Sequence, residues 1–67
     1  MALTKTKQLF IDGLQLFPLS EGQRVRIYLM TETEEQMWQM MDFMASSQSA
    51  TADELMAQAI KITGGLK

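Results

Sequence analysis

The clearest pattern of apolar and polar positions runs through residues 52–63 and predicts an amphipathic helix. Apolar side chains gather on one side when successive residues are turned by about 100°, and polar ones gather on the other side. The apolar side consists of Leu55, Met56, Ala59, Ile60, Ile62 and Thr63. Thr51 and Glu54 have the spacing of a capping box, and Gly64 can end the helix in the left-handed conformation.

A second helix is predicted to begin within the polar run at residues 31–36. Thr31 with Glu34, or Thr33 with Gln36, has the spacing of a capping box. Acidic side chains are favoured near the positive end of a helix dipole. We therefore interpret the glutamates of this run as capping and solvated residues, because a cation site would need a turned loop that brings oxygen ligands together. They are Glu32, Glu34 and Glu35.

A stripe of methionines follows at the spacing i, i+3, i+4 and i+7, and we expect it to pack in a core or an interface. The stripe comprises Met37, Met40, Met41 and Met44. Trp38 flanks the stripe on one side, whereas Phe43 lies near the opposite face, between Gln36 and Gln39 in projection. Because one core would not cover both sides, Phe43 is the first candidate for a contact between chains.

Residues 3–17 are predicted to form a helix with two apolar faces. One face carries Leu3, Phe10, Leu14 and Phe17, and the other carries Leu9 and Leu16. Gly13 in the middle disfavours a helix by about 1 kcal/mol relative to alanine. The pair Asp12-Gly13 is also typical of a tight hairpin turn, so a hairpin remains an alternative.

Residues 20–30 fit two structures. Ser20 with Gln23 has the spacing of a capping box and favours a short helix. In contrast, apolar residues alternate with other residues as in a half-buried strand: Val25, Ile27 and Leu29 alternate with Arg24, Arg26 and Tyr28. A strand would need the Asp12-Gly13 hairpin as its partner. The preferred fold is therefore all-α with about four short helices, and the alternative is α+β with an N-terminal hairpin or meander before two helices.

The chain has 67 residues and contains neither cysteine nor histidine. A chain of this length forms one small domain, here taken as residues 1–67, and buries only about 60% of its unfolded surface. Disulfides and the usual zinc ligands are absent from the sequence. We therefore expect extra stabilisation to come from association, with a homo-oligomer or another protein as the partner.

Several classes of function are disfavoured by composition. Without histidine or cysteine the commonest acid–base and nucleophilic groups are missing, so neither enzymatic activity nor a bound cofactor or metal is expected. The net charge of −2 argues against a nucleic-acid partner. No apolar run approaches the length of about 20 residues that spans a membrane, and a cytoplasmic location is expected.

The sequence thus predicts a small protein-interaction or regulatory module that self-associates through an apolar helix face. The predicted contact residues are Phe43, Trp38, Leu9 and Leu16. The alternative function is a nucleic-acid-associated regulator with a basic surface. Its residues would be Arg24, Arg26, Lys5 and Lys7, with Arg24 and Arg26 as possible anion contacts.

Overall fold

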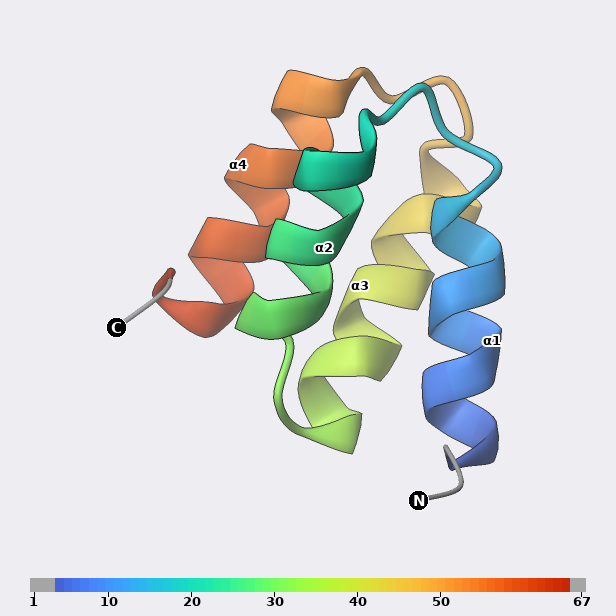
Figure 1. Cartoon of the computed structure of the whole chain (residues 1–67), viewed down its shortest axis with the longest axis vertical. Coiled ribbons are helices and arrows are strands. Elements are labelled where there is room, and N and C mark those ends of the chain that lie inside the picture. Colours follow the sequence, from blue (N-terminus) through green and yellow to red (C-terminus); the bar gives the residue numbers. More distant parts are fainter. Residues whose placement is uncertain (1–3, 66–67) are drawn as a thin grey trace.

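Residues 4–65 are described by a computed structural model and form helices joined by short turns (Figure 1). The helices are α1 (Lys5–Leu14), α2 (Glu21–Met30), α3 (Glu34–Ser46) and α4 (Ala52–Thr63). Each begins after a serine or threonine whose hydroxyl accepts a hydrogen bond from the backbone N–H three residues later. In α2, α3 and α4 a glutamine or glutamate completes the capping box. The helix starts are therefore specified by local sequence.

The all-α fold is confirmed, and the alternative with an N-terminal hairpin is wrong. Helix α1 continues through Asp12 and Gly13, so no turn forms at that pair. In segment 20–30 both hydrogen bonds of the capping box form, and they favour the helix over a strand. The Gln23 N–H donates to Ser20 Oγ at 3.2 Å, and the Ser20 N–H donates to Gln23 Oε1 at 2.9 Å. Of the expected first helix, Leu3 lies outside the described residues.

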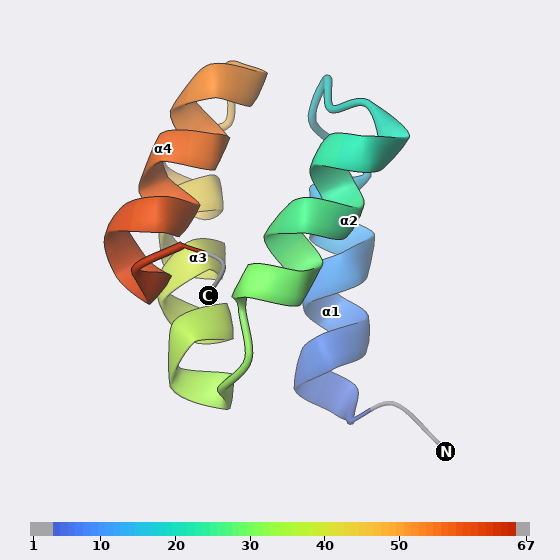
Figure 2. The ribbon, with the colours of Figure 1, turned by 60° about the vertical axis from the view of Figure 1, so that its left-hand side comes forward.

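The four helices are arranged as two pairs. Helix α1 packs on α3, α3 packs on α4, and α4 packs on α2. Figure 1 shows that α1 and α3 run in the same direction, with α2 and α4 running in the opposite direction. In Figure 2 the α2 and α4 ribbons lie in front of α1 and α3. The molecule therefore has an α1/α3 layer and an α2/α4 layer, with the core between them.

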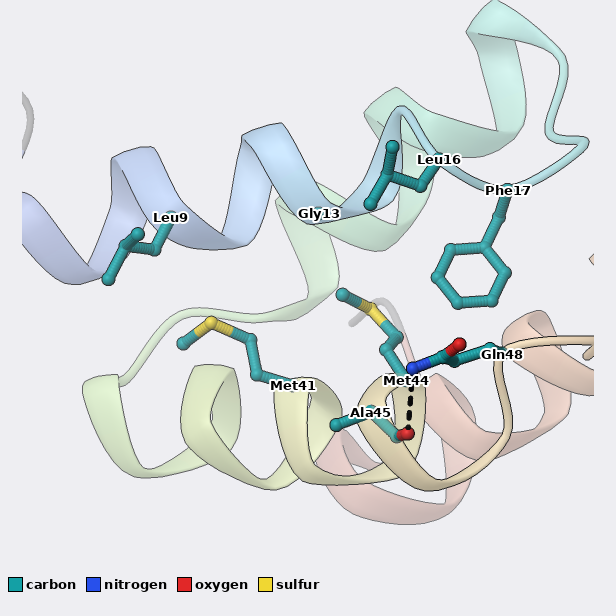
Figure 3. A pocket seen from close by; sticks show the side chains of 8 residues that line it. All are labelled: Leu9, Gly13, Leu16, Phe17, Met41, Met44, Ala45 and Gln48. Carbon is teal, nitrogen blue, oxygen red and sulfur yellow. Dashed lines mark hydrogen bonds between the residues drawn. The ribbon is translucent and has the colours of Figure 1, made fainter.

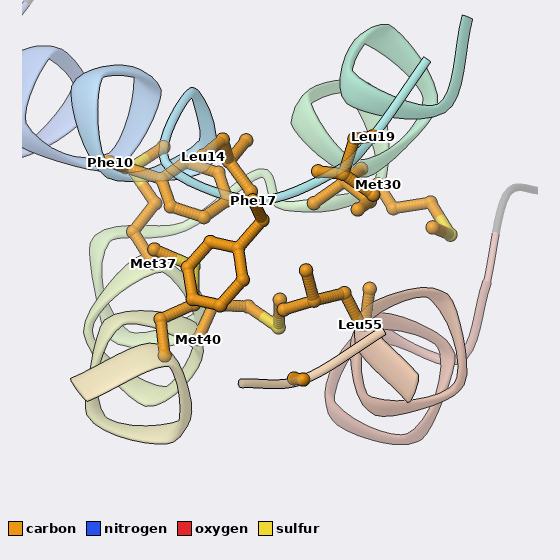
Figure 4. Close-up of a cluster of buried hydrophobic side chains, with 12 residues drawn as sticks. Phe10, Leu14, Phe17, Leu19, Met30, Met37, Met40 and Leu55 are labelled. Carbon is orange, nitrogen blue, oxygen red and sulfur yellow. The ribbon is translucent and has the colours of Figure 1, made fainter. Parts of the chain in front are cut away.

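The core between the layers is rich in methionine and aromatic side chains (Figure 4). Its buried residues are Phe10, Leu14, Phe17, Leu19, Ile27, Met30, Met37, Met40, Met44, Ala50, Leu55 and Ala59. Three of the four methionines in the predicted stripe are thus buried, which confirms that the stripe packs in the core. Unbranched thioether side chains suit this position because they adapt to the irregular gaps between short helices.

Thr31 belongs to the core and does not cap α3. The N-cap of α3 is Thr33, so of the two predicted capping boxes only the one with Gln36 forms. Thr31 is 1% exposed, and its hydroxyl donates to the Ile27 carbonyl oxygen at 2.7 Å. Within residues 4–65 every buried polar side-chain atom has a hydrogen-bond partner. The burial of Thr31 therefore leaves no unpaired polar group.

The end of α4 agrees with the sequence, but one residue of its predicted apolar side is not buried. Gly64 adopts a left-handed conformation with φ 83°, as expected of a helix C-cap. Leu55 and Ala59 are buried, whereas Ile60 is 50% exposed. The apolar side of α4 is wider than the surface that α2 and α3 cover, so Ile60 at its edge faces solvent.

The contrast between buried and exposed leucines gives a test of this fold. Leu55→Ala should lower the free energy of unfolding by about 2–5 kcal/mol, because it opens a cavity in the core. Leu16→Ala removes the same atoms from a side chain that is 85% exposed and should cost less than about 1 kcal/mol. Urea unfolding followed by circular dichroism at low protein concentration measures both. Equal losses for the two variants would contradict the described packing.

Candidate functional site

An apolar groove with a volume of about 520 Å³ lies between α1 and α3 (Figure 3). From α1 and the turn after it come Leu9, Gly13, Leu16 and Phe17. From α3 and the turn after it come Met41, Met44, Ala45 and Gln48. Gln48 is the one polar side chain among them, and its Nε2 lies 3.5 Å from the Ala45 carbonyl oxygen. We call this surface the α1/α3 groove.

Leu9 and Leu16 line the groove because the core occupies a different side of α1. Phe10, Leu14 and Phe17 fill the core side. Leu9 stands next to Phe10 and Leu16 stands next to Phe17, so each is turned well away from the core direction. Leu9 is 51% exposed and Leu16 is 85% exposed. The predicted division of this segment into two apolar faces is therefore observed, and Leu9 and Leu16 line the same groove.

The α3 side of the groove is formed by the methionine that the core does not bury. Met41 is only partly buried, and Figure 3 shows its side chain below that of Leu9. Trp38 precedes Met41 by three residues and Ala45 by seven, so it lies on the same side of α3. Trp38 is 50% exposed. It extends the apolar surface of the groove along α3, which places three of the four predicted contact residues on one face.

Phe43, the fourth predicted contact residue, lies elsewhere. It is two residues from Met41, and residues with that separation point to different sides of a helix. Its side chain is partly buried against the core cluster. Helix α3 packs against both α1 and α4, so the core covers more of its circumference than a helix with one neighbour would allow. Phe43 is thus already partly covered within the chain.

Gly13 brings α1 close to α3 at the floor of the groove. A Cβ atom added at this position would lie 2.9 Å from Met44 Cε, which is closer than side-chain carbons normally approach. The glycine therefore leaves room for the end of Met44. Gly13, which disfavours a helix in the sequence analysis, therefore has a packing role at the groove.

Acidic side chains border the groove on both helices. On α1, Asp12 is three residues after Leu9 and is exposed. On α3, Glu34 precedes Trp38 by one helical turn and Asp42 follows it by one turn; both are exposed. Lys5, one turn before Leu9, is the one basic residue on the same part of α1. The border of the α1/α3 groove is therefore predominantly negative.

The two arginines of the alternative hypothesis do not share one side of α2. Arg24 and Arg26 are two residues apart on a helix, so they project from different sides of α2. Arg24 Nη1 donates to the Leu19 carbonyl oxygen at 3.2 Å. Lys7 Nζ lies 5.5 Å from the centre of the Tyr28 ring, a cation–π geometry. Arg24 and Arg26 would share one face only if this segment were a strand, and it is helical.

Chemical features beyond the groove are few in the described part of the chain. Among residues 4–65 no three acidic side chains converge as metal ligands would. None of the four helices is long and apolar enough to cross a bilayer. No protein-family model, curated protein sequence or solved structure matches this chain. The groove geometry is therefore the basis for an inference about function.

The close approach at Gly13 gives a second test. Gly13→Ala should raise the free energy of unfolding by up to about 1 kcal/mol, because alanine favours the helix and the flexible end of Met44 can turn into the groove. Gly22→Ala is the matched control, since nothing lies within 4 Å of a Cβ atom there. Thermal unfolding measures both. A Gly13→Ala variant that loses more than about 1 kcal/mol would show that Met44 cannot move.

Proposed function

We propose that the protein is a protein-binding module that self-associates by burying the α1/α3 groove. The observation that carries this proposal is that the exposed Leu9 and Leu16 both line one groove whose side chains are almost wholly apolar. Scattered exposed leucines are ordinary on a protein surface, whereas a continuous apolar groove with a polar border is typical of an interaction site.

The chemistry of the lining favours a protein partner over a small polar ligand. A small-molecule site usually has several polar groups that converge on the ligand. Here Gln48 is the one polar side chain in the lining, and its amide lies near the backbone of its own turn. Side chains of leucine, methionine and phenylalanine instead suit an apolar helix face laid along the groove.

The magnitude of burial predicts a modest affinity. Fully burying a leucine contributes about 1.5–3 kcal/mol, so covering the half-exposed Leu9 and the mostly exposed Leu16 contributes roughly 3 kcal/mol together. A dissociation constant of 1 mM already corresponds to about 4 kcal/mol. Binding therefore needs Trp38 and Met41 in addition, and aromatic anchors carry much of the energy of such contacts.

This proposal predicts concentration-dependent association. Sedimentation of the wild-type chain from about 10 μM to about 1 mM should show a rising mass, with a dissociation constant in the micromolar to millimolar range. The emission of Trp38, the only tryptophan, should move to shorter wavelength as the complex forms, because the half-exposed ring loses water. Leu9→Glu with Leu16→Glu should weaken the association by at least about 30-fold.

The control for added charge is Ala57→Glu, which places a carboxylate on an exposed position of α4 away from the groove. It should associate as the wild type does. The proposal fails if the wild-type mass stays at 7.6 kDa throughout the range. It also fails if the groove variant and the Ala57→Glu variant associate equally well.

A further inference from the structure

A second exposed apolar feature lies on the outer side of α2. Val25 and Leu29 are one helical turn apart, on the side opposite the buried Ile27. They are 50% and 55% exposed. Tyr28 lies next to them and is partly buried. We call Val25, Tyr28 and Leu29 the α2 ridge.

Basic side chains flank the ridge on both sides. Arg24 and Arg26 stand on either side of Val25 in the sequence, so they project from opposite flanks of the ridge. Arg24 borders a shallow hollow toward α1, and Arg26 borders one toward α4. Lys7 adds a further positive charge over the Tyr28 ring. Glu21, one turn before Val25, is the one acidic residue on the same side of α2, so the border of the α2 ridge is predominantly positive.

The ridge complements the groove in charge, and both surfaces are apolar along their centres. The groove is concave and apolar, with Asp12, Asp42 and Glu34 along its border. The ridge is an exposed apolar strip on the outer side of one helix, with arginines along its flanks. Two copies placed groove to groove would bring like charges together, whereas a ridge laid into a groove pairs opposite charges. Charge complementarity therefore selects the second arrangement.

The two features also belong to different layers of the molecule. The groove is formed by α1 and α3, and the ridge is on α2 in the other layer. Figure 3, which looks into the groove, shows the α2 and α4 ribbons behind α1 and α3. A chain that occupies a neighbour's groove with its ridge thus keeps its own groove open to another copy.

We infer that the occupant of the α1/α3 groove is the α2 ridge of a second copy of this chain, held in a head-to-tail contact. This inference rests on the proposed self-association and specifies its geometry. Because the contact joins two different surfaces, it repeats from copy to copy and yields a ring or an open filament. A contact between two identical surfaces would stop at a dimer.

Two complementary variants test the head-to-tail contact. The ridge variant carries Val25→Glu and Leu29→Glu, and the groove variant carries Leu9→Glu and Leu16→Glu. All four positions are exposed, so both chains should retain the circular dichroism spectrum of the wild type. Each variant alone keeps one of the two surfaces and lacks the complementary one. Each should therefore sediment as a monomer at concentrations at which the wild type is associated.

Mixing the two variants should restore association. The intact groove of the ridge variant accepts the intact ridge of the groove variant, and their other two surfaces are inactive, so the mixture should form 1:1 dimers and nothing larger. Suppose that the wild type associates. The head-to-tail contact is then wrong if the mixture stays monomeric, or if the ridge variant alone associates as the wild type does, whereas the proposed self-association remains supported. A wild-type chain that never associates overturns the proposed function and this contact together.

Milder substitutions keep the test valid if a double variant fails to fold. A Val25→Ala, Leu29→Ala chain mixed with a Leu9→Ala, Leu16→Ala chain should show the same recovery of association, with smaller amplitude.

The salt dependence of association is an independent test on the wild-type chain. Raising sodium chloride from about 50 mM to about 500 mM should weaken association several-fold, because it screens the opposite charges. Association that is unchanged or strengthened by salt contradicts the charge pairing.

Discussion

The single methionine-rich core can bury only some of the apolar side chains, and this limit determines which of them remain on the surface. Four short helices of 10 to 13 residues enclose the core, and each can turn only part of its circumference inward. The chain has no cysteine with which to fasten a less complete core. Apolar side chains beyond the capacity of the core therefore stay at the surface, in positions set by helix geometry.

The site follows from that constraint on two adjacent helices. On α1 the core takes Phe10 and leaves Leu9, and on α3 it takes Met40 and leaves Met41 partly covered. Packing of α1 on α3 places these remaining side chains together along one groove. Association between copies would cover the groove, and it would add the stabilisation that a core of this size lacks.

Local sequence rules predict the helices and the exposure of several site residues, because caps and helical periodicity act within one element. Leu9, Leu16 and Trp38 are exposed as their positions indicate. Phe43 could not be placed in this way, because its burial depends on α3 having a neighbour on each side. The groove itself could not be predicted from the sequence, because the residues of one helix do not indicate which residues of another helix lie opposite Leu9.

The alternation of Val25, Ile27 and Leu29 has a structural meaning that differs from the strand it resembles. Folded as a helix, this pattern directs Ile27 into the core and leaves Val25 and Leu29 outside. The α2 ridge therefore consists of apolar residues whose spacing is typical of a strand but which lie on a helix.

The most direct test of the head-to-tail contact is an intermolecular nuclear Overhauser experiment on a mixture of carbon-13-labelled and unlabelled chains. A head-to-tail contact should give signals between Leu16 methyl groups of one chain and the methyl groups of Val25 and Leu29 of another, whereas signals confined to Leu16 of both chains would contradict it.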